Sequence, residues 1–206
     1  VKQVALDIAG ENPRLAPNPA TGALPLCDPA DEATIKPFAL AFGLMRATPE
    51  GLRLYDVVTE NDVCVAVDEI AYNAAYAEAR RTHSGDWSAS TIVIDRGLVR
   101  SGAADVLAAV LVHEATHIDR AVSGKACFFD DDCKRLPNGV EVDEEVAAHA
   151  AEAEWWIAAF GTDGKRFAVR VDYSENRLVR AYLRGGDSFR AYVARFRGDP
   201  REGEGF

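Results

Sequence analysis

The chain has 206 residues, of which 48% are hydrophobic and 27% are charged, a composition typical of one globular domain with a buried core. It carries 33 acidic and 23 basic residues, a formal net charge of -10, which disfavours nucleic acid and anionic lipid as partners. No apolar run reaches the roughly 18 residues needed to span a bilayer, so we expect no transmembrane segment.

Prolines crowd the N-terminal end, where six of the nine fall within residues 1–37. Proline has no backbone N–H to donate and has a fixed φ, so it interrupts helices and central strands. We therefore predict a proline-rich N-terminal arm over residues 1–47, extended from Val1 to about Pro37, and a single folded domain over residues 48–206.

Hydrophobic periodicity and end signals divide the remainder into helices and strands. Helices show capping residues and apolar residues three and four apart, whereas strands are short β-branched runs. In chain order we expect a helix at 48–61, a strand at 63–67, a segment of either type at 70–80, a polar loop at 82–90, a strand at 91–95, and helices at 103–122, 142–160, 175–183 and 188–196. The predicted class is α+β, with the sheet in the first half.

The four cysteines form an even set whose spacings match no zinc-knuckle or thioredoxin pattern, which favours disulfides. Cys127 and Cys133 would close a short loop, and Cys27 with Cys64 would tie the arm to the domain. Four reduced cysteines in a cytosolic protein are the alternative. The disulfides, and a chain that begins at Val1 and so allows a removed signal peptide, predict a secreted or periplasmic protein.

The most specific motif is HExxH, formed by His113, Glu114 and His117 within the predicted helix 103–122. Histidines four residues apart project from one face of a helix, so two imidazoles can offer nitrogen ligands to one zinc ion. The glutamate beside the first histidine can take a proton from a water activated by the metal. The chain has only four histidines, so chance rarely produces this spacing. The motif predicts one catalytic Zn²⁺ ion with Glu114 as general base.

With this motif, residues 48–160 resemble the zincin metallopeptidases, because a helix, a core strand, an edge strand and an active-site helix follow in the zincin order. The resemblance implies an α+β fold in which a small twisted sheet packs on the HExxH helix, followed by a mostly helical C-terminal half. It also implies that substrate pairs with the edge strand at Thr91, Ile92 and Val93.

Residues around the motif narrow the type of zincin. Metzincins have glycine and histidine three and six residues after the second motif histidine, where this chain has Arg120 and Ser123, and the only methionine, Met45, precedes the motif. Aspzincins carry a Gly-Thr-x-Asp-x-x-Tyr-Gly stretch, of which residues 161–164 reproduce a fragment with altered spacing. The chain thus resembles gluzincins, which take a glutamate ligand from a second helix.

The helix after the cysteine loop, at about 142–160, would supply this glutamate, and its candidates are Glu141, Glu144, Glu145 and Glu152, the last on the same face as Glu145. A helical wheel of its apolar residues places Glu145 beside the buried stripe and Glu144 nearly opposite, in solvent. Glu145, followed by Ala148 and His149, resembles the gluzincin glutamate helix and is the expected third zinc ligand. His149 stands where well-known gluzincins have an aspartate that orients a ligand histidine. It is open whether His149 orients a ligand, binds metal, donates a hydrogen bond in the transition state or is a satisfied core residue.

These features predict a zinc-dependent endopeptidase acting on a peptide or protein substrate. Two alternatives stay open: a non-catalytic, zinc-containing binding module with the same fold, and an amidase acting on cell-wall peptide. The intact Glu114 argues against the binding module, because a structural zinc site needs no base.

Other side chains of catalytic type are expected to play lesser roles. Three tyrosines after the glutamate helix are candidate oxyanion donors, with nothing to select among them: Tyr173, Tyr182 and Tyr192. The groups expected to be structural or solvated are His83 in the polar loop, the acidic turn Asp130, Asp131 and Asp132, and the core residues Trp155 and Trp156.

Overall fold

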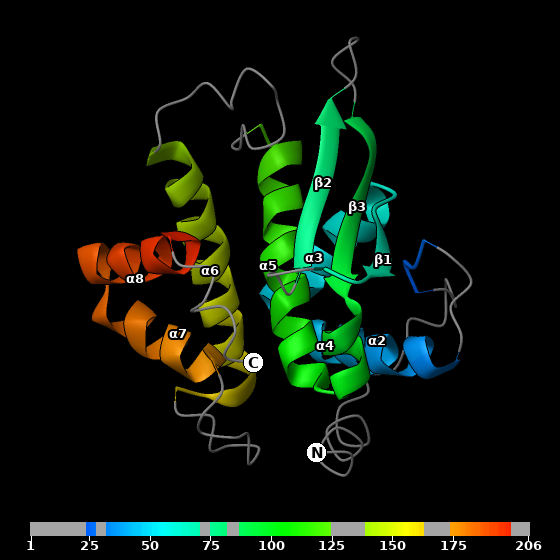
Figure 1. Ribbon diagram of the computed structural model, residues 1–206, viewed down its shortest axis with the longest axis horizontal. Helices are drawn as coiled ribbons and strands as arrows, with labels where there is room; N and C mark the ends of the chain where they lie inside the picture. The colour runs from blue at the N-terminus through cyan, green and yellow to red at the C-terminus, as the bar shows by residue number, and fades with distance from the viewer. Residues whose placement is uncertain are drawn as a thin grey trace.

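The computed structural model describes residues 24–27, 32–70, 75–81, 87–124, 139–162 and 174–198. These residues form an α+β structure that is mostly helical and contains one small sheet (Figure 1). The elements are α2 (Glu32–Met45), α3 (Pro49–Glu60), β1 (Cys64–Asp68), β2 (Ala75–Arg81), β3 (Trp87–Asp95), α4 (Arg96–Ser101), α5 (Ala104–Val122), α6 (Gly139–Phe160), α7 (Ser174–Arg184) and α8 (Gly186–Gly198). The five helices predicted from 48 onward are confirmed, with ends that differ by up to three residues.

Helix α2 occupies residues 32–45 and so begins within the stretch up to Pro37 that was predicted to be extended, which makes that part of the prediction wrong. Pro37 lies inside the helix and removes one backbone hydrogen bond from it. Burial of a whole apolar face, at about 25 cal/mol per Å², outweighs this loss. The buried residues of that face are Phe38, Ala41, Phe42 and Met45. Helix α2 is therefore part of the folded core.

The three strands are arranged in the order β1-β3-β2. β3 runs parallel to β1, with Cys64 opposite Thr91, and antiparallel to β2, with Ala75 opposite Ile94. Within the described residues, the other edge of β2 pairs with no strand. β2 thus assigns residues 75–80 of the ambiguous segment 70–80 to a strand and forms the open edge of the sheet within the described residues.

The position of β3 corrects two predictions. It begins at Trp87, inside the predicted polar loop, and it is the central strand. Thr91, Ile92 and Val93 consequently lie between two partners and cannot form an edge that receives a substrate strand. A β-branched run looks the same at the edge and in the centre of a sheet, and pairing with a distant strand decides between them.

A disulfide joins Cys27 to Cys64 at the start of β1, with the two Cα atoms 4.8 Å apart, which confirms one predicted pair. Beside it, Leu26 forms a parallel bridge with Val65, and Cys27 N donates a hydrogen bond to Val65 O. Residues 24–27 thus cover the outer edge of β1.

The end of α2 is a junction for two other helices. Thr48 caps α3 as predicted, its Oγ1 accepting a hydrogen bond from Gly51 N at 3.0 Å. Gly51 lies so close to α2 that a Cβ there would stand 1.9 Å from Met45 O. Trp155 of α6 donates its indole N–H to the same carbonyl oxygen at 3.1 Å. Trp155 and Trp156 are both buried in the core, as predicted.

Helix α5 runs through the centre of the domain, between the sheet and α6, and also packs on α2 and α3 (Figure 1). Beyond α6 lie α7 and α8, which pack on α6 and on each other. The two halves of the domain therefore meet along the contact between α5 and α6.

Among the described residues, no helix combines the length and the apolar character needed to cross a membrane.

Candidate metal centre

His113 and His117 stand one turn apart on α5 and converge as the HExxH spacing predicts. Their Nε2 atoms are 3.2 Å apart. Both side chains are shielded from solvent, with exposed fractions of 11% and 5%. Because α5 is packed on several sides, the imidazoles lie inside the domain, where they face α6.

Glu145 of α6 completes a group of three donor atoms. Its Oε2 lies 3.4 Å from His113 Nε2 and 3.9 Å from His117 Nε2. Tetrahedral zinc with ligands at about 2.0–2.1 Å places neighbouring donor atoms about 3.3 Å apart. Two imidazole nitrogens and a carboxylate oxygen at these separations fit such an ion. The structure thus brings together the three residues predicted as metal ligands.

Glu114 follows the first histidine and is buried. Burial raises the pKa of Glu114 to about 7; the opposing effect of His113 is outweighed, and the charges of Glu145 and Glu152 raise it further. A carboxyl group that titrates near neutrality can take a proton from water and later return it to a leaving group. The predicted general base is buried next in sequence to the ligand His113, and its pKa responds to the charges of His113 and Glu145.

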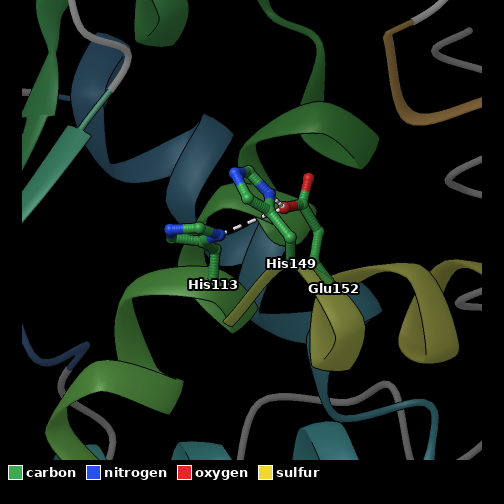
Figure 2. Close-up of side chains that lie close together, drawn as sticks. All are labelled: His113, His149 and Glu152. Atoms are coloured by element: carbon green, nitrogen blue, oxygen red, sulfur yellow. Dashed lines mark hydrogen bonds and ion pairs between the residues drawn. The ribbon is translucent and has the colours of Figure 1, made fainter. Parts of the chain in front are cut away.

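Glu152 of α6 is part of the site, although among the four candidate glutamates the sequence favoured Glu145 and gave Glu152 no role of its own. Figure 2 shows its carboxylate beside the rings of His113 and His149, and its Oε2 lies 3.2 Å and 2.8 Å from their respective Nδ1 atoms. Burial alone would raise the pKa of Glu152, but the hydrogen bonds from the two histidines hold it at about 2. An ionised carboxylate only accepts hydrogen bonds, so both rings must carry a proton on Nδ1.

This tautomer prepares His113 to bind a metal. With its proton on Nδ1, a neutral ring presents the lone pair of Nε2 toward His117 and Glu145. Burial lowers the pKa of His113, yet the hydrogen bonds of Glu145 and Glu152 raise it well above its ordinary value. The buried carboxylates thus attract a positive charge to this point, either a proton or a metal ion.

His113, His149 and Glu152 are also close enough together to be considered a second metal-binding group. The 2.8 Å separation of His149 Nδ1 from Glu152 Oε2 is, however, the length of a hydrogen bond and shorter than the spacing of two zinc ligands. We therefore interpret this group as support for the ligand His113. Among the roles left open for His149, the contacts favour orientation of a ligand through Glu152.

The sequence did contain a signal for Glu152. It lies seven residues after Glu145, almost two helical turns, so both carboxylates project from the same side of α6. The resemblance directed attention to the position four residues after Glu145, where His149 stands. Here the carboxylate that orients the ligand histidine is one turn further along the helix.

The prediction that Glu144 points into solvent is wrong. Glu144 is buried, and its two carboxylate oxygens accept hydrogen bonds from Arg120 Nε and Nη2, each at 2.7 Å. The wheel considered only the apolar residues of one helix. Arg120 extends from α5 and supplies the opposite charge that makes burial of Glu144 tolerable.

Two of the candidate oxyanion donors, Tyr182 and Tyr192, lie within the described residues. The hydroxyl of Tyr192 is shielded from solvent. Tyr182 donates to Glu154, which lies on the side of α6 opposite Glu145. The predicted groups outside the described residues are Tyr173, His83, Asp130, Asp131, Asp132 and the pair Cys127 and Cys133.

Comparison with known proteins yields no relative of this chain. No protein-family model, no curated protein and no solved structure matches it. Its function is therefore inferred from the residues of the site.

Proposed function

We propose that the protein is a zinc-dependent peptidase of the gluzincin type, with a zincin-like fold, in which His113, His117 and Glu145 hold one Zn²⁺ ion. The observation that carries this proposal is the convergence of their three donor atoms, 3.2 to 3.9 Å apart, beside a buried carboxyl group. A bound zinc ion would supply polarisation of the scissile carbonyl and would bring the pKa of water toward about 7.

The chain's own residues would carry out the proton transfers and hold the metal ligands in position. Glu114 takes a proton from the attacking water and donates it to the leaving amine, so that bond cleavage and protonation of the amine proceed together. Glu152 holds the Nδ1 proton of His113 and so keeps the Nε2 lone pair directed at the ligand group. His149 shares the same carboxylate oxygen and supports its orientation.

A peptide substrate would be bound in extended form. β2 is the open edge of the sheet within the described residues, and it contacts α5, which carries the HExxH motif. Backbone groups along such an edge can pair with an added strand, and this requires no particular substrate sequence. We accordingly assign substrate pairing to β2, and propose peptide or protein substrates.

The Cys27–Cys64 disulfide supports an oxidising compartment, in which such bonds form and persist. We therefore propose that the protein acts outside the cytosol, as a secreted or periplasmic enzyme.

The test compares the wild type with Glu114→Gln on a broad peptide library that includes cell-wall peptides. Glutamine keeps the size of the side chain but cannot act as a base, so the variant should retain zinc and fold yet lose about 10²- to 10⁴-fold in hydrolysis. Glu154→Gln, an exposed change on α6, is the matched control and should behave as wild type. Chelation should abolish the wild-type activity and added zinc should restore it.

The other outcomes are also informative. Equal, zinc-independent hydrolysis by the wild type and Glu114→Gln contradicts the mechanism. Zinc bound by both proteins without hydrolysis by either would support the non-catalytic binding module. Cleavage confined to cell-wall peptides would identify the amidase.

A further inference from the structure

Two consecutive carboxylates of α6 meet different partners on α5. Glu144 accepts two hydrogen bonds of 2.7 Å from Arg120. Glu145, the next residue, approaches Nε2 of His113 at 3.4 Å and Nε2 of His117 at 3.9 Å. A cation of the protein therefore holds one carboxylate, and the candidate metal ligands surround the other.

The chemistry of the two side chains cannot determine which of them becomes the ligand, because they are identical. Consecutive helical residues differ by about 100° in direction and about 1.5 Å in height. Exchanging the two carboxylates by rotation would turn α6 by about 100°, which its buried face, with Trp155 and Trp156 in the core, opposes. The buried face therefore sets the rotation of α6, and a partner outside α6 is needed only to hold the flexible Glu144 side chain away from the histidines.

Arg120 has the properties needed for that task. It lies three residues after His117, on the same helix as two of the ligands, so its distance from them is fixed by α5 itself. Its planar guanidinium binds a carboxylate through two parallel N–H groups, which fixes direction as well as distance. Its side chain is about one quarter exposed, whereas that of Glu144 is only 4% exposed.

Net stability is a weak explanation for this pair. Taking two charges out of water costs much of what their attraction returns, so buried ion pairs often contribute little to stability. A buried polar contact can instead specify one register among several, as single buried polar residues do in coiled coils. Asp119 and Asp143 also act on Arg120. Their negative charges raise its pKa, which favours the charged guanidinium.

We propose that Arg120 is a positioning residue that, by binding Glu144, holds this carboxylate out of the ligand group and so leaves Glu145 to His113 and His117. This inference rests on the metal-binding part of the proposed function and is independent of hydrolysis. Arg120 thereby determines which of two adjacent carboxylates joins the metal centre.

The experiment measures zinc affinity by chelator competition, and the absorption spectrum of the Co²⁺-substituted protein, which reports the ligands. Arg120→Met leaves Glu144 without its partner and should weaken zinc binding by about 10-fold or more, within the range known for residues that orient metal ligands. It should also change the Co²⁺ spectrum. The double variant Arg120→Met with Glu144→Leu removes the competing carboxylate and should return both readouts close to those of the wild type.

A third comparison tests the competition directly. In the wild-type background Glu145→Ala should nearly abolish zinc binding, whereas with Arg120→Met the same change should cost less, because the released Glu144 can take its place. If Arg120→Met does not fold, as judged by circular dichroism, Arg120→Lys replaces it, since lysine keeps the charge but lacks the two-pronged contact.

The outcomes separate the two proposals. A folded Arg120 variant with unchanged zinc affinity and Co²⁺ spectrum overturns the positioning role, even if its thermal stability falls. A double variant that binds zinc as weakly as Arg120→Met shows that Arg120 acts through its own charge, and also overturns it. Failure of the wild type to bind Zn²⁺ or Co²⁺ refutes the proposed metal centre itself, and this inference with it.

Discussion

Replacement of Glu152 by glutamine tests whether one buried carboxylate organises the metal centre. The change preserves size, and the amide oxygen can still accept a hydrogen bond, but the negative charge is lost. That charge is what both histidines contact, since Oε2 lies 3.2 Å from His113 Nδ1 and 2.8 Å from His149 Nδ1. The variant therefore removes the charge-assisted part of two hydrogen bonds without opening a cavity.

The contribution of the ionised Glu152 to stability follows from its pKa. The hydrogen bonds from the histidines overcome burial and lower the pKa from 4.5 to about 2. At 1.36 kcal/mol per pH unit, this corresponds to about 3 kcal/mol in favour of the ionised form in the metal-free protein. Because the pKa is depressed on folding, this stability is fully present above pH 4.5 and is lost as the pH falls toward 2.

Two assays follow from this reasoning. Urea unfolding of the chelated proteins should show Glu152→Gln less stable than wild type at pH 7, with a difference that shrinks below pH 4.5 as the wild-type carboxylate is protonated. Competition with a chelator should show zinc affinity reduced by about 10- to 100-fold. Glu154→Gln, on the exposed side of the same helix, is the control for loss of one negative charge. A stability difference that does not change with pH, together with unchanged zinc affinity, would refute the role given to Glu152.

Two further predictions concern a ligand and a packing contact. Glu145→Ala should reduce zinc affinity by more than the roughly 10- to 100-fold expected for a residue that only orients a ligand. Dialysis followed by metal analysis would show this loss. Retention of stoichiometric zinc by the variant would exclude Glu145 as a ligand. Gly51→Ala should destabilise the fold by about 1–3 kcal/mol in urea unfolding, because the new Cβ would lie 1.9 Å from Met45 O. The exposed Leu52→Ala on the same helix should change stability far less, and equal effects of the two would contradict the close contact.

The sequence by itself determined the features that depend on residues within a few turns of one another. Thr48 followed by Pro49 fixes the start of α3, because capping involves only the first turn. The four-residue spacing of His113 and His117 guarantees that their rings share a face of α5, wherever that helix packs. The position of Glu145 beside the apolar stripe of α6 was likewise readable, and the structure places it at the histidines.

The tertiary structure decided the features that depend on partners distant in sequence. Pro37 indicated an extended arm, but the segment is helix α2, because the apolar face that follows Pro37 is buried in the core. The central position of β3 required pairing with both β1 and β2, which no property of its own residues specifies. Glu144 is buried only because Arg120 of another helix pairs with it. A charged side chain takes its place according to the partner it meets, and that partner is known only once the helices are packed.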